Sequence, residues 1–190
     1  SVTKHDVSGG IRLSELRHVL DELRPWVGLP VRQAWVTHPS QVVLAIGPHQ
    51  LLIESHPLPR IHPTSHRPKS PGTPFSFQGL LRSRFSGLLT SVRGGELDRV
   101  VELEVGAVVL HARLFGRGGG IWLLDQGRVV AASTGPSAEQ LPPLLTPRED
   151  PRPPRFQPGA EGRWGEAAAA WFQEAARREA DERLRQRLGA

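Results

Sequence analysis

The 190-residue chain contains no cysteine. It therefore has no disulfide bond, no thiolate nucleophile and no cysteine-bound zinc. No apolar run approaches the roughly 18 residues that a membrane-spanning helix needs. The first ten residues, SVTKHDVSGG, are polar and lack the apolar centre of a secretory signal peptide. From these absences we expect a cytoplasmic protein that makes no contact with a membrane.

Acidic residues are also missing from one long stretch of the chain, between Glu54 and Glu96. The formal net charge is +5, and this stretch contributes six of the basic residues: Arg60, Arg67, Lys69, Arg82, Arg84 and Arg93. A local excess of positive charge indicates a phosphate-rich partner. The alternative is that folding brings acidic residues from elsewhere alongside these cations. The sequence leaves both readings open.

Hydrophobic spacing predicts two helices and a series of short strands. Apolar residues recur at helical intervals over 13–23, and Pro25 and Gly28 end that pattern. A second helix is predicted over 74–89. Short apolar runs bounded by turn residues predict strands at 31–38, 41–47, 51–55, 88–93, 99–105, 107–114, 121–125 and 128–133. Six prolines within 56–74 predict a long irregular loop.

The last third of the chain changes composition twice. Residues 136–162 are proline-rich and predict a partly extended linker. Residues 163–190 are rich in Ala, Glu and Arg and predict a helix. We expect this helix to dock through Trp164, Trp171 and Phe172, on its own domain or on a second copy. Its apolar stripe then narrows, which is typical of the start of a coiled coil and predicts self-association or a partner helix.

The stretch GGELDRVVELEV, residues 94–105, places an opposite-charge pair at the entrance of an apolar strand. Leu97 and Val101 are expected to anchor that strand in the core. Asp98 and Arg99 then have two readings. They form a strand-end ion pair of low energetic value, or the Arg99 guanidinium binds a phosphate or a base edge while Asp98 orients it.

Other candidate sites are weak by sequence. The glycine-rich run 116–120 suits a hairpin better than a phosphate cradle, because no helix follows it. His56, His62 and His66 share a loop without nearby carboxylates or thiolates, so we expect no metal. No Ser–His or paired-carboxylate arrangement is apparent. We therefore expect no cofactor and no catalytic residue.

Four segments in order carry a family resemblance: LLIESHPLPRIHPT (51–64), PFSFQGLLRSRFSGLL (74–89), LDRVVELEV (97–105) and RLFGRGGGIWLLD (113–125). Together they resemble the N-terminal domain of the NFACT family, also labelled fibronectin-binding protein A. The bacterial member of that family acts in ribosome-associated quality control. The chain departs from the family pattern at Gln78, at Arg113–Phe115 and at Gly118–Gly120.

The resemblance implies an α+β fold. It implies an antiparallel β-sandwich-like domain similar to the N-terminal domain of formamidopyrimidine DNA glycosylases, with two packed helices. The implied domain covers 11–135, the linker 136–162, and a C-terminal helix at 163–190 begins a coiled coil. The linker is too short for the helix-hairpin-helix segment that this family usually carries at that place.

The resemblance also implies a function. Such a factor binds alanyl-tRNA and an obstructed large ribosomal subunit, and the ribosome itself then adds an alanine tail to the stalled chain. Asp98, Arg99, Arg113, Leu114 and Phe115 are implied as tRNA-binding residues. Arg60, Arg82, Arg84 and Arg117 are the predicted phosphate contacts.

Two alternatives belong to other classes. One is a surface adhesin for fibronectin or fibrinogen, as the second family label suggests. The other is a nucleic-acid-binding protein with a glycosylase-like fold. Glycosylase activity itself is disfavoured, because that chemistry uses an N-terminal proline and no proline precedes Pro25.

Overall fold

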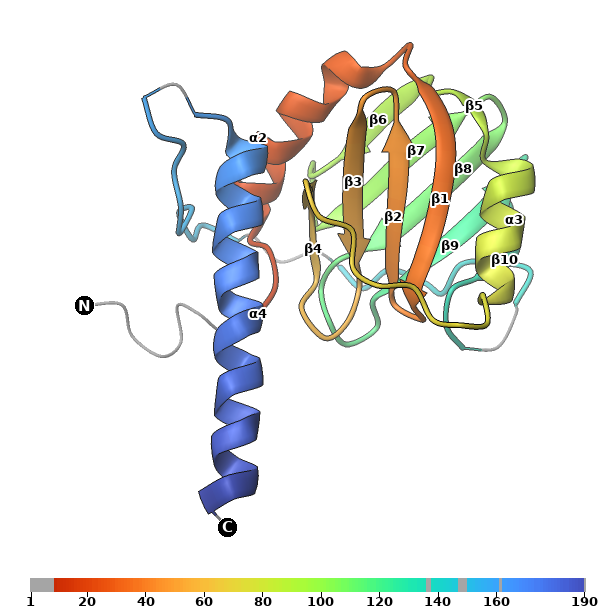
Figure 1. Cartoon of the computed structure of the whole chain (residues 1–190). Coiled ribbons are helices and arrows are strands. Elements are labelled where there is room, and N and C mark those ends of the chain that lie inside the picture. The colour runs from red at the N-terminus through yellow and green to blue at the C-terminus, as the bar shows by residue number, and fades with distance from the viewer. Residues whose placement is uncertain (1–8, 136–137, 147–149, 161, 190) are drawn as a thin grey trace.

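The structure is a computed structural model that describes residues 9–135, 138–146, 150–160 and 162–189. Its body is a sandwich of two five-stranded antiparallel sheets (Figure 1). The first sheet has the order β4-β3-β2-β1-β5. Its strands are β1 (Pro30–His38), β2 (Gln41–Ile46), β3 (His49–Glu54), β4 (Arg60–Pro63) and β5 (Gly87–Leu88). The architecture confirms the predicted α+β class; the likeness to a glycosylase domain stays a prediction.

The second sheet has the order β10-β9-β8-β7-β6, so each strand pairs with its neighbour in sequence. Its strands are β6 (Ser91–Gly94), β7 (Val100–Val105), β8 (Val108–Arg113), β9 (Gly120–Asp125) and β10 (Arg128–Ala132). All five agree with the apolar alternation and the turn glycines of the sequence. Gly106 and Gly127, at φ +61° and +80°, occupy hairpin turns that other residues adopt with strain.

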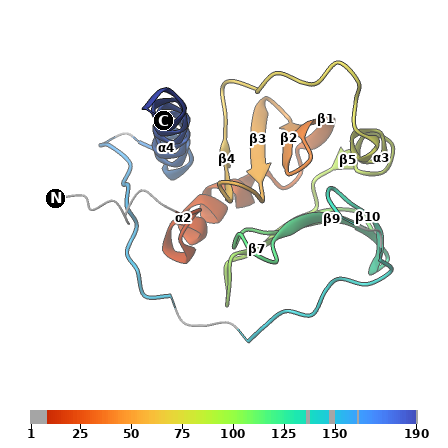
Figure 2. The same ribbon diagram turned by 90° about the horizontal axis from the view of Figure 1, so that it is seen from below.

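Two helices close the open sides of the sandwich (Figure 2). Helix α2 (Leu13–Leu23) is followed by the 3₁₀ turn η1 (Arg24–Trp26) and packs against the edge strands β4 and β6. Helix α3 (Ser76–Arg84) packs against β1 and β10 at the opposite side. Each helix thus covers an edge of both sheets, where unpaired backbone groups would otherwise be exposed.

The core lies between the sheets and follows the two periodicities of the sequence. On β2, Val42, Leu44 and Ile46 belong to the inner cluster, as do Val101 and Leu103 of β7. The helical face of α2 buries Leu16, Val19, Leu20 and Leu23 in the same cluster. Each fully buried side chain of this size contributes about 1.5–3 kcal/mol. This burial holds the sandwich together.

Two segments differ from the sequence prediction. Strand β4 lies inside the proline-rich stretch that we expected to be a loop, and it pairs with β3 from Arg60 to Pro63. It occupies the sheet edge, where a proline can be tolerated because one side of the strand needs no ladder bonds. Helix α3 is also shorter than the predicted 74–89, since the chain extends after Phe85 and Gly87–Leu88 pair with β1.

The long helix α4 (Trp164–Gly189) docks on its own domain, against β4 and α2. Trp164 stacks on His18 with ring centroids 3.8 Å apart. Phe172 is fully buried beside His62 and Phe156. These contacts confirm the predicted docking through aromatic residues. Farther along, Leu184 and Leu188 are exposed, and the second half of the helix extends away from the sandwich (Figure 1).

The segment before α4 has no helix or strand in its described residues, 138–146 and 150–160. It is nevertheless tied to α2 by a buried ion pair. Arg155 donates from Nη2 to Glu15 Oε1 at 2.9 Å and from Nε to Oε2 at 3.0 Å. Glu15 also accepts the backbone N–H of Arg12 at 2.9 Å. A segment expected to be a plain linker therefore packs as part of the domain.

Candidate nucleic-acid interface

The turn between β6 and β7 presents the Asp98–Arg99 pair. Gly94 and Gly95 have φ of +146° and +72°, and Gly95 N–H donates to Val100 O at 3.1 Å. This backbone course closes the loop tightly at its base. Val101 is buried as expected, but Leu97 is 72% exposed, so the prediction that Leu97 anchors the strand is wrong. Leu97 instead lines a surface hollow together with Leu144 and Leu145.

Gly94 is expected to be indispensable for this turn. A Cβ at Gly94 would lie 2.2 Å from Val100 O, a backbone atom that cannot move without breaking the β6–β7 ladder. We expect Gly94→Ala to lower the free energy of unfolding by about 1–3 kcal/mol. Denaturant unfolding of the variant measures this. Gly79→Ala in α3 is the control, because a Cβ there would meet no atom within 4 Å, and it should be neutral or stabilising.

Arg99 is held only loosely by its neighbour. Its Nε lies 3.8 Å from Asp98 Oδ1, and its Nη1 donates a long bond of 3.5 Å to Ile11 O. Asp98 Oδ1 instead accepts the backbone N–H of Arg99 at 2.7 Å. Burial lowers the pKa of Arg99, and the nearby positive charge of Arg152 lowers it further, against the opposing effect of Asp98. An anion bound at this guanidinium would stabilise its charged form and so offset the effects of burial and of Arg152.

The second motif lies directly beside the first. Leu114 N–H donates to Arg99 O at 2.8 Å, which joins the end of β8 to the start of β7. Arg113 is buried and rigid: its Nε donates to His111 Nε2 at 3.0 Å, and its Nη1 donates to Pro142 O at 2.8 Å. The glycine-rich run after Phe115 forms the β8–β9 turn, in which Gly119 N–H donates to Gly116 O. This confirms the hairpin reading of that run.

Both motifs line one cleft of about 670 Å³. It gathers residues from the two hairpins and from the segment before α4: Leu13, Asp98, Arg99, Arg113, Phe115, Arg117, Gly118, Pro142, Pro143, Leu144, Leu145, Thr146, Asp150 and Arg152. Four arginines and two aspartates belong to this lining. The arrangement therefore offers a cationic cleft with an aromatic ring and exposed apolar side chains.

The wall formed by the segment before α4 is not evident from the sequence. Arg152 donates to both carboxylate oxygens of Asp150, at 2.8 and 2.9 Å. These bonds lower the pKa of Asp150 to about 2, so it stays ionised at neutral pH. The only local signal is the Asp-x-Arg spacing itself. Nothing in that spacing says that the pair faces residues much earlier in the chain.

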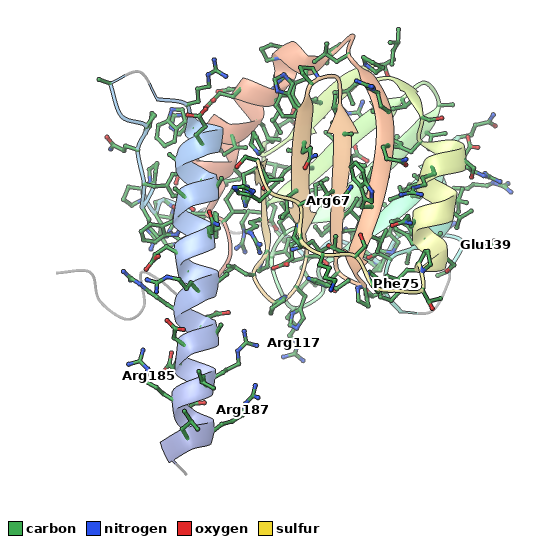
Figure 3. All side chains as sticks on the ribbon, viewed as in Figure 1. Arg67, Phe75, Arg117, Glu139, Arg185 and Arg187 are labelled. Atoms are coloured by element: carbon green, nitrogen blue, oxygen red, sulfur yellow. The ribbon has the colours of Figure 1, made fainter. Side chains whose placement is uncertain are left out.

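The remaining predicted RNA contacts lie elsewhere. Arg60 is buried and bound to Glu54, and the Leu114 side chain is fully buried, so neither side chain can reach an external ligand in this structure. Arg82 and Arg84 lie on α3, where Arg82 donates to Ala34 O and Arg84 faces Asp125 at 3.4 Å. None of these four residues lines the cleft, and their contact with RNA stays a prediction. Arg117 does belong to its lining and is exposed (Figure 3).

The acid-free stretch does not form one continuous basic surface. Arg60, Arg84 and Arg93 each meet acidic residues from other strands, Arg93 through Glu102 and Glu104. The Arg67 guanidinium lies over the Trp35 ring, 3.8 Å from its centroid. For Arg60, Arg84 and Arg93, folding therefore brings acidic residues alongside the cations, which was the alternative to a phosphate-rich partner. The sequence does not show these partners, because they meet only when neighbouring strands pair or when α3 packs on the second sheet.

The described part of the chain offers neither a metal site nor a membrane span. Within it, no three His, Asp or Glu side chains are grouped so as to hold a metal ion. None of its helices is long and apolar enough to cross a membrane.

A family model described as NFACT N-terminal and middle domains matches residues 13–149. No curated protein sequence matches the chain. Among solved structures, the N-terminal domain of fibronectin-binding protein PavA from Streptococcus pneumoniae is similar, with TM-score 0.59 and 24% identity, over 75% of this chain and 62% of that one.

Two further structures share the fold. The N-terminal part of a fibronectin/fibrinogen-binding protein from Streptococcus suis has TM-score 0.60 and 22% identity, over 77% of this chain and 62% of that one. A fibrinogen-binding protein from Staphylococcus aureus has TM-score 0.55 and 17% identity, over 75% and 57%. The chain thus spans less than two thirds of each solved relative. At these identities the likeness establishes a common fold.

Proposed function

The chain belongs to the NFACT family, and from this membership we propose that it is an RNA-binding part of a ribosome-associated quality-control factor. Its ligands are tRNA, in particular alanyl-tRNA, and the obstructed large ribosomal subunit. It supports the addition of an alanine tail to stalled chains. The observation that carries the proposal is the convergence of Asp98, Arg99, Arg113, Phe115 and Arg117 on one cleft.

The side chains divide the binding between them. Arg99, partly exposed and weakly bonded within the protein, offers a planar fork of donors to a phosphate or to a guanine edge. Asp98 accepts from an exocyclic amine or a ribose hydroxyl. Phe115 stacks on an unpaired base, and the exposed Arg117 contacts a phosphate. Arg113, fixed by His111 and Pro142, adds positive charge to the floor.

The proposed role is positioning, without a bond-making step by this chain. The two carboxylates of the cleft are Asp98 and Asp150. Asp150 has a pKa lowered to about 2 by Arg152, which suits an ion-pair partner and not a general acid at neutral pH. The ribosome then supplies the chemistry of peptide bond formation.

The test is a double-mutant cycle at Asp98 and Arg99. We expect Arg99→Ala to weaken binding of alanyl-tRNA by about 5- to 150-fold, equivalent to about 1–3 kcal/mol, if Arg99 reads a base edge. If it contacts a phosphate, the loss is smaller and the salt slope falls by about one. Asp98→Ala should add little once Arg99 is gone, since the two act together. Binding is measured with the full-length protein over a range of salt concentrations.

Arg128→Ala is the control, because it removes one exposed arginine that lies outside the cleft and is not a predicted RNA contact. Melting temperatures of all variants should stay close to that of the parent. Unchanged tRNA affinity in the double mutant would reject the functional role. A large fall in melting temperature would show instead that the pair is structural.

A fibronectin- or fibrinogen-binding adhesin is the second candidate. Three solved proteins of the same fold are described as binding these ligands. The exposed Leu97, Leu144 and Leu145 form an apolar border to the cleft that would suit a protein ligand. Co-sedimentation of the full-length protein with large ribosomal subunits, beside binding to immobilised fibronectin, separates the two candidates.

A further inference from the structure

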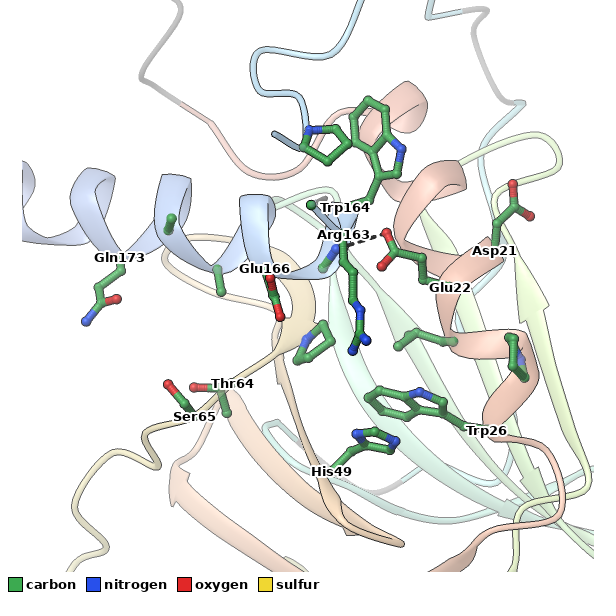
Figure 4. A pocket seen from close by; sticks show the side chains of 18 residues that line it. Asp21, Glu22, Trp26, His49, Thr64, Ser65, Arg163, Trp164, Glu166 and Gln173 are labelled. Carbon is green, nitrogen blue, oxygen red and sulfur yellow. Dashed lines mark hydrogen bonds between the residues drawn. The ribbon is translucent and has the colours of Figure 1, made fainter. Parts of the chain in front are cut away.

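A larger cleft, of about 960 Å³, lies between the end of α2, the start of β3 and the first turns of α4 (Figure 4). It shares no lining residue with the cleft around Arg99. Its floor is made by Trp26 and His49, whose rings stack with centroids 4.3 Å apart at an angle of 4°. Both residues are only partly buried. The stacked pair therefore presents a flat aromatic surface to an external group.

The charged groups around this floor are mostly acidic. Asp21, Glu22 and Glu166 belong to the lining, against one cation, Arg163. Asp21 is bound to Arg24 outside the lining, and Glu22 accepts the backbone N–H of Gly165 at 3.2 Å. Glu22 and Glu166 form no ion pair with any described residue. Both carboxylates are thus free to take a cation.

The side chain of Arg163 shows that this cleft can hold a guanidinium group (Figure 4). It extends into the cleft from the start of α4, on the side of Glu22 and facing Trp26 (Figure 4). That side chain makes no hydrogen bond or ion pair with the described part of the chain. The guanidinium therefore occupies the acidic, aromatic space without being fixed in it. An external guanidinium can replace it at little cost in lost contacts.

We propose that this cleft binds an arginine side chain within a basic peptide segment of a protein partner. A guanidinium placed over the Trp26 face gains a cation–π contact. Its planar fork matches the carboxylate geometry of Glu22 or Glu166. The chain as a whole carries +5, so an acidic cleft on it is a local reversal of charge. Asp21 is neutralised by Arg24, which leaves Glu22 and Glu166 against Arg163. This balance is still acidic, so it repels phosphate and disfavours RNA as the occupant.

The binding test uses the 190-residue chain and an acetylated, amidated tetra-arginine peptide, followed by calorimetry at low salt. Tetraglycine with the same ends is the neutral control ligand. We expect Glu166→Arg to weaken peptide binding by about fivefold or more, as loss and reversal of a partly exposed charge contact. Arg163→Ala should strengthen binding by about two- to fivefold, because it removes the internal competitor. Glu179→Arg, the same charge change on an exposed later turn of α4, should alter it by less than about twofold.

The test is decisive because Glu166→Arg is expected to weaken peptide binding and Arg163→Ala to strengthen it. Glu166 and Arg163 are both exposed, so both variants should fold. Glu166 lies in the first turn of α4, so Glu166→Arg should lower the melting temperature slightly. A folding defect cannot produce the stronger binding expected of Arg163→Ala. Equal weakening by Glu166→Arg and Glu179→Arg would mean general electrostatic attraction and would overturn the proposal. The proposal would also be overturned if the tetra-arginine peptide bound no better than tetraglycine. A third outcome would be binding of a tetra-adenylate RNA that Arg163→Ala weakens and Glu166→Arg strengthens. In that case the cleft binds nucleic acid and the proposal is wrong.

Discussion

Glu15→Ala is expected to lower the free energy of unfolding by about 3–5 kcal/mol, because it removes one member of a buried ion pair. Glu15 is fully buried, and Arg155 lies beneath α4 with its guanidinium 5.5 Å from the Trp171 ring and 5.9 Å from the Phe172 ring. Without the carboxylate, Arg155 keeps its positive charge in an apolar setting. Denaturant unfolding at neutral pH measures the loss.

The double mutant Glu15→Ala with Arg155→Ala should be less destabilised than the sum of the two single variants, since the second change removes the unpaired charge. Arg24→Ala is the control. It breaks the exposed pair with Asp21 and should cost less than about 1 kcal/mol. If Glu15→Ala costs no more than Arg24→Ala, the segment before α4 is not held to the domain by this pair.

The domain is expected to lose roughly 3 kcal/mol of stability as the pH falls from 6.5 to 4, through His62 alone. Burial lowers the pKa of His62 to about 4 from an ordinary value of 6.5, and the charge of Arg60 lowers it further. The hydrogen bonds agree with a neutral ring. Nδ1–H donates to Pro63 O at 2.8 Å, and Nε2 accepts from Arg60 Nε at 3.3 Å.

The sign follows from proton binding. Below pH 6.5, His62 is protonated in the unfolded chain, whereas in the folded chain it stays neutral until the pH reaches about 4. The unfolded chain thus binds more protons between pH 6.5 and 4, so a fall in pH over this interval favours unfolding. Glu54 adds to the trend at lower pH. Burial alone would raise its pKa, but the hydrogen bond from His38 and the charge of Arg60 lower it overall. Its contribution is present above its unfolded value of 4.5 and is lost as the pH falls below that.

His62→Gln should flatten the stability profile between pH 6.5 and 4, whatever it does to stability at neutral pH. The measurement is the free energy of unfolding across that range. His66→Gln, on the exposed loop that follows β4, is the control and should keep the slope of the parent. An unchanged slope in His62→Gln would show that His62 is not the group responsible.

Local patterns in the sequence were sufficient for most of the secondary structure. The apolar spacing of α2 and the alternation in β7 depend on residues a few positions apart, and such patterns survive whatever the rest of the chain does. The tandem order of the second sheet follows from short hairpins with glycine turns. The motif around Asp98 and Arg99 was likewise visible in the sequence.

Only the tertiary structure decided the contacts between side chains of different helices, strands and loops. Arg60 looked like a surface cation but pairs with Glu54 across two strands, and Glu15 looked like the polar side of a helix but is buried under Arg155. The segment around Pro142 and Arg152 looked like a linker but forms a wall of the candidate site. A charge is exposed or buried according to what packs over it, and that depends on the path of the whole chain, not on its sequence neighbours.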